Sequence, residues 1–218
     1  MGPRGDLLIY GAGGHAVSVA ETALALGYTI VGFIDDVSAL PTLLGRPVHA
    51  RIPQEHFVRG GQLALAVGDN ARRETLYSTL ASSWPGLRLP VLIHPSSSVS
   101  SLATVGEGSV VLQGAVVGAG SMVGALCIVN SGAVLDHECT MADLASLAPN
   151  TAVGGRVRIG RRSAICIGAT VKHGVVIGED TIVGAQSYVN RDLENRVVAY
   201  GCPARVIRAR EARDSYLD

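Results

Sequence analysis

A period of six residues runs through the second half of the 218-residue sequence and constrains the fold more than any other feature. From residue 93 onward, seventeen hexads follow one another in frame, and each begins with Val, Ile, Leu or Met. The fifth position is Ser, Ala, Thr, Cys or Val in every hexad except the last. This period fits neither an α-helix nor an array of hairpins. It is typical of a parallel β-solenoid in which three hexads form one triangular coil.

The repeat also predicts how the solenoid is packed. The first residue of each hexad is expected to point inward and to stack on its counterpart 18 residues later, one coil further along. The small fifth residue fits the tight space near a corner. Seventeen hexads give between five and six coils, which pair like parallel strands about 4.8 Å apart. An irregular β-sandwich would need loops that interrupt the frame, and the sequence has none there.

The first 90 residues follow a different pattern, which predicts a small Rossmann-like α/β domain. An apolar strand, a glycine turn and a helical pattern ending at Gly27 lead to a second strand that closes on Asp35 and Asp36. Residues 62–84 repeat the order of strand, turn and amphipathic helix. A parallel sheet is expected. The predicted domains are residues 1–90, residues 91–200 for the solenoid, and residues 201–218 for a turn and a helix that caps its open end.

The composition narrows the class of protein. Hydrophobic residues make up 48% and charged residues 17%, which indicates a globular chain, and the formal net charge of zero gives no general attraction to nucleic acid or to a membrane surface. No apolar run approaches the roughly 20 residues that cross a bilayer, and the N-terminus does not resemble a signal peptide. A cytoplasmic location is therefore predicted. The four cysteines form no C-x-x-C pair, so no zinc site or disulfide framework is indicated.

The glycine turn after the first predicted strand is the first candidate binding site. Residues 11–16, GAGGHA, fit the pattern G-x-G-x-x-[GA] at a helix start, where free N–H groups favour phosphate. NAD is one possible ligand, with Asp35 or Asp36 on a ribose. About 90 residues hold only part of a dinucleotide fold, so a nucleoside diphosphate fits better, and a turn without a ligand is a third possibility. The second strand-end loop, at Gly68, is either a ligand loop or a helix cap.

The segment SGAVLDHECTM, residues 131–141, is the second candidate site. His137 holds the third place of its hexad, at or beside a corner, so its ring is expected to face outward. Asp136 or Glu138 could orient the imidazole and raise its basicity, as a general base requires. A metal site is not predicted, because His137 and His173 lie two coils apart, about 9.6 Å along the solenoid.

Five segments in order, YGAGGHA, GFIDD, VGDNAR, NSGAVLDHECTMAD and GCPARVI, carry a family resemblance over nearly the whole chain. The chain looks like the bacterial hexapeptide-repeat acyltransferases, whose solenoids are left-handed β-helices. More narrowly, it resembles the sialic acid O-acetyltransferase/PglD-type family, which includes N-acetyltransferases of nucleotide-linked 4-amino sugars. The resemblance implies a homotrimer, with acetyl-CoA as cosubstrate in the groove between neighbouring solenoids, and a nucleotide-sugar held by the N-terminal domain.

The resemblance also implies roles for particular residues. His137 matches the catalytic base and Glu138 the residue that supports it. One departure is that a second histidine, expected nine residues after the base, is Ser146 here, so a contact on the cofactor side is changed. The remaining residues implied to bind the nucleotide-sugar are Gly13, Gly14, His15, Asp35, Asp36 and Gly68, and those implied to contact acetyl-CoA, besides position 146, are Gly155, Ile167 and His173.

The predicted function is acetyl transfer from acetyl-CoA to the 4-amino group of a UDP- or GDP-linked amino sugar. The amine attacks the thioester directly, His137 takes the proton, and backbone N–H groups of a corner stabilise the oxyanion. Cys139 is less suited to carry the acyl group, because it holds an inward fifth position. The alternatives are O-acetylation of a sugar such as sialic acid, a non-enzymatic nucleotide-sugar sensor, and a NAD-dependent oxidoreductase. No metal, nucleic acid or membrane insertion is expected.

Overall fold

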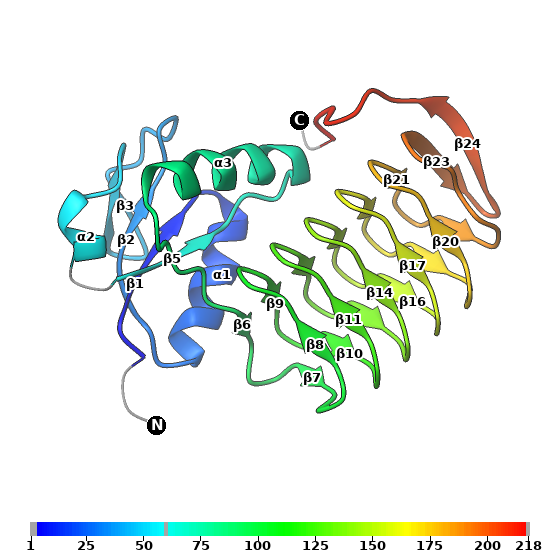
Figure 1. The fold of residues 1–218 in the computed structure, drawn as a ribbon, viewed down its shortest axis with the longest axis horizontal. Coiled ribbons are helices and arrows are strands. Elements are labelled where there is room, and N and C mark those ends of the chain that lie inside the picture. The colour runs from blue at the N-terminus through cyan, green and yellow to red at the C-terminus, as the bar shows by residue number, and fades with distance from the viewer. Residues whose placement is uncertain (1–3, 59–60, 217–218) are drawn as a thin grey trace.

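The computed structural model describes residues 4–58 and 61–216, in which an α/β domain is followed by a long parallel β-helix (Figure 1). The α/β part ends with a helix that closes at Ser83, and the strand at Leu92 already belongs to the β-helix. The α/β domain and the parallel solenoid were both predicted from the sequence, and both are confirmed. The domain boundaries at residues 90 and 200 stay a prediction.

The N-terminal sheet is parallel across four of its strands. Strand β1 pairs with β2 on one side and with β5 on the other, and β2 pairs in parallel with β4. Only the short edge strand β3 runs antiparallel, against β4. In spatial order the strands are β3 (Thr42–Leu43), β4 (Arg46–His49), β2 (Thr29–Ile34), β1 (Asp6–Tyr10) and β5 (Gln62–Leu65).

Three helices accompany this sheet: α1 (Gly14–Ala25), α2 (Gln54–Val58) and α3 (Asn70–Ser83). Helix α1 ends just before Gly27, whose φ of 86° suits glycine best. The Asp69 carboxylate caps α3 by accepting a hydrogen bond from Arg72 N at 2.8 Å. Helices α1 and α3 each follow directly on a strand of the parallel sheet, so their N-termini lie at one edge of it. None of these helices is long and apolar enough to cross a membrane.

Three parallel sheets form the sides of the β-helix, and partners on successive coils are 18 residues apart, as in Val116 with Val134. The first sheet contains β6 (Leu92–Ile93), β9 (Val110–Val111), β12 (Ile128–Val129), β15 (Ser146–Leu147), β18 (Ala164–Ile165), β21 (Ile182–Val183), β23 (Val197–Gly201) and β24 (Ala204–Ala209). The second contains β7 (Ser98–Val99), β10 (Val116–Val117), β13 (Val134–Leu135), β16 (Ala152–Val153), β19 (Thr170–Val171) and β22 (Tyr188–Val189). The third contains β8 (Thr104–Val105), β11 (Met122–Val123), β14 (Thr140–Met141), β17 (Arg158–Ile159) and β20 (Val176–Ile177).

The interior of the β-helix follows the hexad pattern. Residues at the first position, such as Leu135 and Val153, are buried in one continuous core cluster. Residues at the fifth position, such as Ala133 and Cys139, are also fully buried. Each pairing repeats after one coil, so a residue at a given hexad position meets its own kind above and below. The predicted inward stacking is therefore confirmed.

The C-terminal segment corrects one prediction, because the expected capping helix is a β-strand. Strand β23 pairs in parallel with β21, and β24 then turns back to pair with β23 antiparallel. The last coil is two residues shorter than the others, since Ile182 pairs with Val198. The physical reason is that β23 offers unpaired backbone groups at the end of the sheet, and β-branched Val206 and Ile207 favour pairing with it over a helix.

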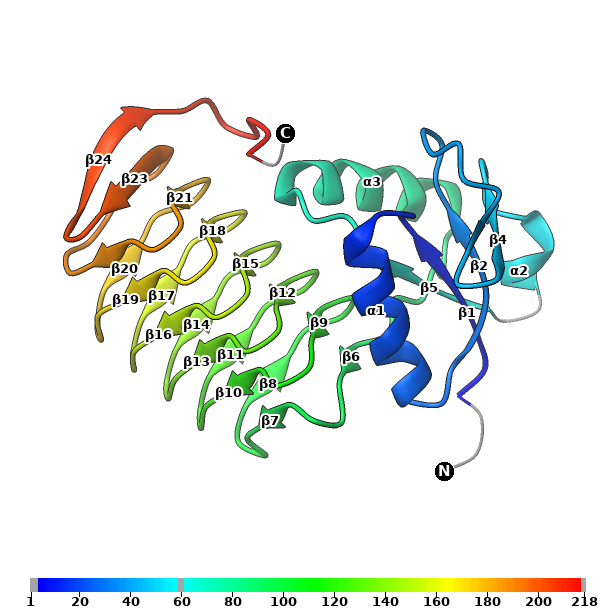
Figure 2. The same ribbon diagram turned by 180° about the vertical axis from the view of Figure 1, so that it is seen from behind.

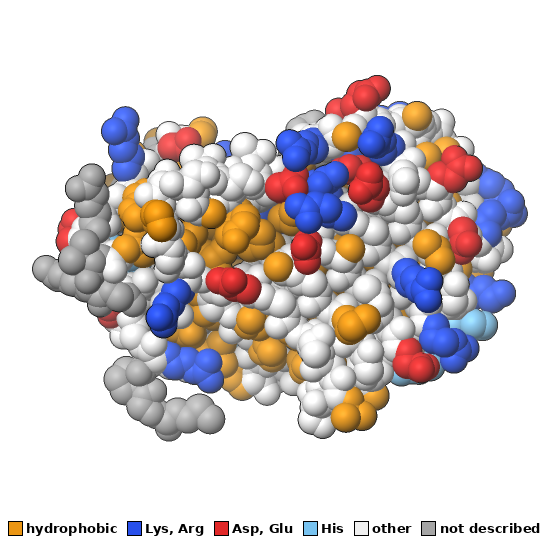
Figure 3. All heavy atoms as spheres, in the orientation of Figure 1, with side chains coloured by type: hydrophobic (Ala, Val, Ile, Leu, Met, Phe, Trp, Pro, Cys, Tyr) orange, Lys and Arg blue, Asp and Glu red, His pale blue; other side chains and the backbone are white. Residues whose placement is uncertain are grey.

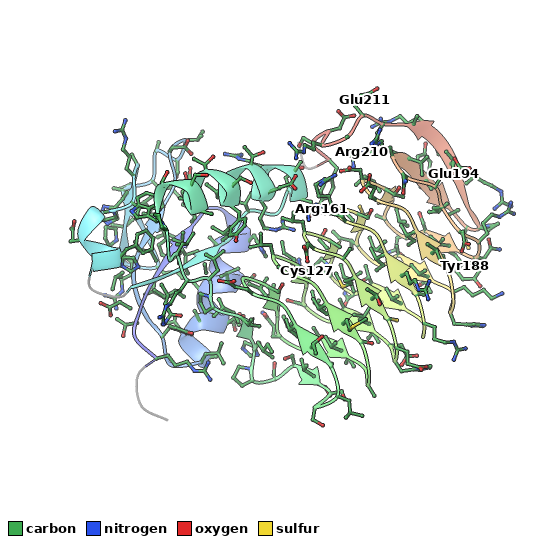
Figure 4. All side chains as sticks on the ribbon, in the orientation of Figure 1. Cys127, Arg161, Tyr188, Glu194, Arg210 and Glu211 are labelled. Atoms are coloured by element: carbon green, nitrogen blue, oxygen red, sulfur yellow. The ribbon has the colours of Figure 1, made fainter. Side chains whose placement is uncertain are left out.

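The α/β domain is joined to the β-helix by apolar and ionic contacts. Helix α1 lies beside the first strands of the first sheet (Figure 2). It shares an apolar cluster with residues of that sheet, among them Leu92 and Ile128. Below α3, acidic and basic side chains gather on the surface (Figure 3), and Arg161 points toward that helix (Figure 4). Glu74 of α3 accepts hydrogen bonds from Arg161 and Arg162. Because these groups carry opposite charges and are partly buried, they fix the position of α3 on the coils.

Candidate active site

His137 lies in the turn between β13 and β14, at the corner where the second sheet meets the third. Leu135 and Cys139 on either side are fully buried, which directs the His137 side chain outward and leaves it 46% exposed. The backbone is held from both neighbouring coils, because Glu138 N donates to Ala119 O and His137 O accepts from Arg156 N, each at 2.9 Å. The predicted outward position is confirmed. We call His137, Glu138 and Gly155 the histidine corner.

The two carboxylates beside His137 do not hold its imidazole equally. Glu138 Oε2 lies 3.1 Å from Nδ1, within hydrogen-bond distance. Asp136 Oδ2 lies 3.9 Å from Nε2, and Asp136 Oδ1 accepts a hydrogen bond from His137 N at 2.7 Å. Glu138 therefore favours the tautomer with the proton on Nδ1, which leaves Nε2 free to accept a proton. Of the two flanking carboxylates, Glu138 has the geometry of the supporting group.

Gly155, one coil further along, lies directly beneath the imidazole. A Cβ atom at this position would be 2.4 Å from His137 Nε2, a distance that no side chain tolerates. The next residue at the same corner in the following coil is His173, and Gly174 N donates to Gly155 O at 2.9 Å. His137, Gly155 and His173 therefore form one column along this corner. No group of three His, Cys, Asp or Glu side chains that could hold a metal ion occurs within residues 4–58 and 61–216.

Cys139 does not have the properties of a nucleophile. Burial raises the pKa of its thiol, although two backbone N–H groups oppose that shift. The thiol donates to Gly154 O at 3.2 Å inside the coil. Since the thiolate is the reactive form, a buried and protonated thiol favours attack without an acyl-cysteine intermediate.

A cavity of about 560 Å³ opens at the edge of the N-terminal sheet where its strands end, and we call it the strand-end cavity. Its wall contains all six residues that the resemblance assigns to the nucleotide-sugar, namely Gly13, Gly14, His15, Asp35, Asp36 and Gly68. Helix α1 begins here without a side-chain cap, so its first N–H groups remain available to a phosphate. Gly11 allows this approach, because its φ is 113° and a Cβ atom would lie 2.6 Å from Ala66 O.

The two aspartates of this cavity differ in what they can still bind. Asp35 Oδ2 accepts from Ala12 N at 2.9 Å, and its Oδ1 accepts from Val37 N and Ser38 N. Burial acts to raise the pKa of Asp35, but these backbone N–H groups outweigh it and lower the pKa below the usual value. Asp36 is exposed at the cavity. Asp35 therefore shapes the loop, and Asp36 is the carboxylate that is open to a ribose.

Arg72 also lines the strand-end cavity, and the sequence analysis did not assign it. It is exposed on the first turn of α3, beside the fully buried Arg73. A guanidinium next to an uncapped helix N-terminus is a favourable partner for a diphosphate. Its position just after a strand-end loop was a usable signal, since residues at that point of a parallel sheet face its ligand edge.

A second cavity, of about 370 Å³ and mostly apolar lining, adjoins the first, and we call it the apolar cavity. It is lined by Ser146 and Ile167 of the β-helix, by His15 and Gly68 of the α/β domain, and by Tyr216. Because His15 and Gly68 line both cavities, a ligand can extend from one into the other. Neither cavity is lined by His137, Gly155 or His173. The residues implied to contact acetyl-CoA are thus divided within one chain between the apolar cavity and the histidine corner.

His15 lies between the two cavities with an unusual protonation equilibrium. Burial, together with the Arg73 guanidinium, lowers the pKa of His15 to about 4, so the ring is neutral near pH 7. Its Nε2 atom is buried and has no hydrogen-bond partner among the described residues. A buried polar atom of this kind marks a place where a ligand is expected to bind.

Ser146, where the resemblance expects a histidine, is part of a hydrogen-bond network. Asn70 Nδ2 donates to Ser146 Oγ at 3.2 Å, and the Tyr216 hydroxyl lies 3.1 Å from the same oxygen. Burial raises the pKa of Tyr216, which keeps the phenol protonated. The sequence analysis missed Asn70 and Tyr216. Tyr216 gave no signal, because it lies outside every motif and 70 residues from Ser146.

An α/β domain with an uncapped helix N-terminus at a cavity, joined to a β-helix with an exposed histidine at one corner, is typical of the hexapeptide-repeat transferases. The family models agree: residues 6–80 match the PglD N-terminal domain, and residues 156–191 match the bacterial transferase hexapeptide (six repeats). PerB from Caulobacter crescentus, solved in complex with CoA and GDP-perosamine, is 39% identical over 93% of this chain and 97% of its own, with a TM-score of 0.86. The chain belongs to this family of nucleotide-sugar acetyltransferases.

Two other proteins with similar sequences carry the same kind of activity. The acetyltransferase domain of PglB from Neisseria gonorrhoeae is 34% identical, covers 93% of this chain and 99% of that domain, and has a TM-score of 0.85. Galactoside O-acetyltransferase of Escherichia coli (strain K12) is 44% identical over 46 residues. That match spans 21% of this chain and less than a quarter, 23%, of the E. coli enzyme.

Proposed function

We propose that the protein transfers an acetyl group from acetyl-CoA to the 4-amino group of a nucleotide-linked amino sugar. The observation that carries this proposal is the histidine corner, where an exposed imidazole has Nδ1 held by Glu138 and Nε2 free. The PerB structure, which contains CoA and GDP-perosamine, supports this choice of substrates. In this proposal the nucleotide binds in the strand-end cavity, with the diphosphate at Gly13, Gly14, His15 and Arg72, and with Asp36 at the ribose.

The proposed reaction proceeds in one complex without an acyl-enzyme. The amine nitrogen attacks the thioester carbonyl, and His137 Nε2 takes the proton that the nitrogen loses. The carbonyl oxygen becomes an oxyanion, and the Gly155 N–H, which makes no hydrogen bond with any described residue, is the donor proposed for it. The C–S bond then breaks, the amide forms, and the CoA sulfur takes up a proton.

We further propose that the active site lies between two copies of the chain in a homotrimer. Within one chain the histidine corner and the two cavities are built on different faces, and neither cavity is lined by a residue of the corner. A neighbouring copy that brings its corner to the apolar cavity would unite His137 with the acceptor sugar. Acetyl-CoA would then contact Gly155 and His173 of one copy and Ser146 and Ile167 of the other.

The activity is tested with GDP-, UDP- and dTDP-linked 4-amino sugars and acetyl-CoA, scored by release of free thiol. Replacing His137 with Ala is expected to lower kcat/KM at least a hundredfold, about the contribution of a general base. His94→Ala, at a different corner, is the matched control and should keep wild-type activity. A loss below tenfold in the His137→Ala variant would contradict the assignment of the base.

The shared site is tested by complementation between two inactive variants. A Cβ atom at Gly14 would meet no protein atom within 4 Å, and Gly14 lines the strand-end cavity, so Gly14→Tyr is chosen to block that cavity. Mixed trimers of Gly14→Tyr and His137→Ala contain some sites with an intact cavity and an intact histidine. Co-expression should therefore restore part of the activity, whereas a site within one chain would stay inactive in every mixture.

O-acetylation of a sugar hydroxyl is the second candidate, favoured by the match to galactoside O-acetyltransferase. Adding a free sugar and a 4-hydroxy nucleotide-sugar to the panel separates the two functions, because an O-acetyltransferase would prefer one of these as the acceptor. The reported relatives are transferases, which disfavours the sensor and the NAD-dependent oxidoreductase. The cytoplasmic location stays a prediction.

A further inference from the structure

The last described residues of the chain return to the α/β domain and form part of the wall of the apolar cavity. Ser215 Oγ donates to Asp69 Oδ2 at 3.2 Å, and Tyr216 N donates to the same oxygen at 3.1 Å. The other oxygen of Asp69 already caps α3. The C-terminal segment is therefore fixed to the strand-end loop whose Gly68 lines both cavities.

The Tyr216 hydroxyl retains one free position for a hydrogen bond. A phenol has one proton to donate and two lone pairs that accept. The hydroxyl donates to Gly68 O at 3.2 Å, so Ser146 Oγ, 3.1 Å away, is the donor in their shared bond. One lone pair thus remains, at the wall of the apolar cavity.

A second observation beside Tyr216 points to a polar ligand at the same place. His15 lines both cavities, and its buried Nε2 has no partner among the described residues. The other side chains around the apolar cavity are mainly hydrophobic, for example Ile128, Leu147 and Ile167. An apolar pocket with a few convergent polar groups is typical of a site that binds and orients a small molecule.

We propose that Tyr216 is an acceptor-binding residue, whose hydroxyl accepts a hydrogen bond from a hydroxyl or amine of the sugar where it enters the apolar cavity beside His15. This inference rests on the proposed function. The ligand we assign is the sugar of the acceptor, because His15 and Gly68 line both cavities and are therefore where the sugar of a nucleotide in the strand-end cavity would enter the apolar cavity. Tyr216 forms the wall of the cavity without filling it, since about 370 Å³ remains open beside the ring.

The test compares Tyr216→Phe with Tyr77→Phe, a control on α3 that lines a separate crevice. GDP-perosamine is the first probe, followed by the UDP- and dTDP-linked amino sugars. Loss of one hydrogen bond to an uncharged group predicts a rise of about fivefold in the acceptor KM of Tyr216→Phe. The KM for acetyl-CoA should stay within about twofold of wild type, because Ser146, the neighbour of Tyr216 that is proposed to contact acetyl-CoA, keeps its hydrogen bond from Asn70. A role in folding alone would not separate the two KM values. Tyr77→Phe should change neither.

An unchanged acceptor KM in Tyr216→Phe, or an equal rise in both KM values, would overturn the proposal. Deleting residues 215–218 gives an independent result: a higher acceptor KM supports the proposal, whereas activity above wild type would show that the segment is a plug. If wild type acetylates no member of the panel, the proposed function fails. In that case the dissociation constant of each nucleotide-sugar, measured without acetyl-CoA, tests whether Tyr216 binds the acceptor. A weaker binding by about fivefold in Tyr216→Phe supports its role, and equal binding, or no binding to wild type, overturns it.

Discussion

The histidine corner and the junction between the two domains are built in opposite ways. At the corner, His137 and Glu138 are neighbours in sequence, and Gly155 lies 18 residues away, the length of one coil. The side chain of His137 is 46% exposed and rests on a backbone that the coils already hold. At the junction, Arg73 is 1% exposed, and two of its hydrogen-bond partners, Leu126 and Leu144, lie on coils of the β-helix far along the chain. The side chains of the corner therefore contribute to the proposed catalysis and little to stability, whereas those of the junction stabilise the contact between the two domains.

This difference predicts which substitutions separate activity from stability. A side chain on the outside of a regular corner can be replaced without leaving a buried polar group unpaired. At the junction, one side chain serves packing, hydrogen bonding and the shape of a cavity at once. Substitutions at the corner should therefore alter turnover with little change in the free energy of unfolding, and those at the junction should alter both.

The largest expected effect is on stability, and it comes from the neighbouring arginines of α3. The Arg73 guanidinium donates to the carbonyl oxygens of Val67, Gly68, Leu126 and Leu144 and to Asn70 Oδ1. Arg73→Met leaves these acceptors unpaired, except Gly68 O, which keeps the hydrogen bond from the Tyr216 hydroxyl. It should lower the free energy of unfolding by about 3–5 kcal/mol, measured by denaturant titration.

Arg72→Met is the matched control, because Arg72 is exposed on the same turn. It should change the free energy of unfolding by less than about 0.5 kcal/mol and should weaken binding of the nucleotide-sugar. If both substitutions destabilised the protein equally, the contrast between a buried contact and a cavity residue would be wrong.

The second effect concerns the pH dependence of stability, which arises at the junction through His15. The pKa of His15 is about 4 in the folded protein, against 6.5 for a free histidine. Above pH 6.5 the ring is neutral in both states. As the pH falls from 6.5 toward 4, only the unfolded chain takes up the proton, so the folded state loses stability. At pH 5 this loss is about 2 kcal/mol.

His15→Gln removes this titration and keeps a polar side chain at the cavity. The decrease in the free energy of unfolding between pH 7 and pH 5 should therefore be about 2 kcal/mol smaller in the variant than in wild type. An identical decrease in both proteins would contradict this prediction, because it would mean that His15 takes up a proton equally well in the folded and the unfolded state. Carboxyl groups with a lowered pKa, such as that of Asp35, affect stability only at lower pH, so they do not contribute to the difference between pH 7 and pH 5.

The β-helix could be predicted from the sequence because every hexad repeats the same pattern of apolar and small residues. Branched or long apolar residues at the first position and small residues at the fifth fix the inward stacking, and the exposed place of His137 follows from that frame. The strand-end cavity could be predicted equally well, because strand–loop–helix order places Gly13, Asp36 and Gly68 at one edge of a parallel sheet.

Contacts between segments that are far apart in the sequence and belong to no repeat could not be predicted from the sequence. Tyr216 meets Ser146 and Gly68 only because the C-terminal segment crosses back to α3, and no motif marks Tyr216 as their partner. From the sequence alone, residues 201–218 are predicted to form a turn and a capping helix. In the structure, β24 forms a strand instead, because its backbone can pair with the free edge of β23. That edge exists only once the last coil has formed.

The next prediction is at the corner, where a single methyl group should displace the base. Gly155→Ala places Cβ within 2.4 Å of His137 Nε2, so the imidazole must rotate away from its position. We expect kcat to fall about tenfold, because proton transfer depends on the placement of the ring. The melting temperature should be unchanged, since an exposed ring can move into solvent. Combined with His137→Ala, the substitution should cause no further loss; an additional loss would show that Gly155 acts independently of the ring.

The smallest expected effect distinguishes the two carboxylates that flank the base. Glu138→Gln keeps the shape and an acceptor oxygen for Nδ1 but removes the charge that favours the protonated imidazole. Because the Glu138 side chain is 62% exposed, solvent screens part of this interaction, and kcat should fall only about fivefold. Asp136→Asn should change kcat less, because Oδ1 serves the backbone and Oδ2 is 3.9 Å from Nε2. The KM values should change little in both variants, because neither carboxylate is proposed to bind a substrate. A larger loss of kcat in Asp136→Asn than in Glu138→Gln would reverse the assignment, and Asp136 would then be the residue that supports His137.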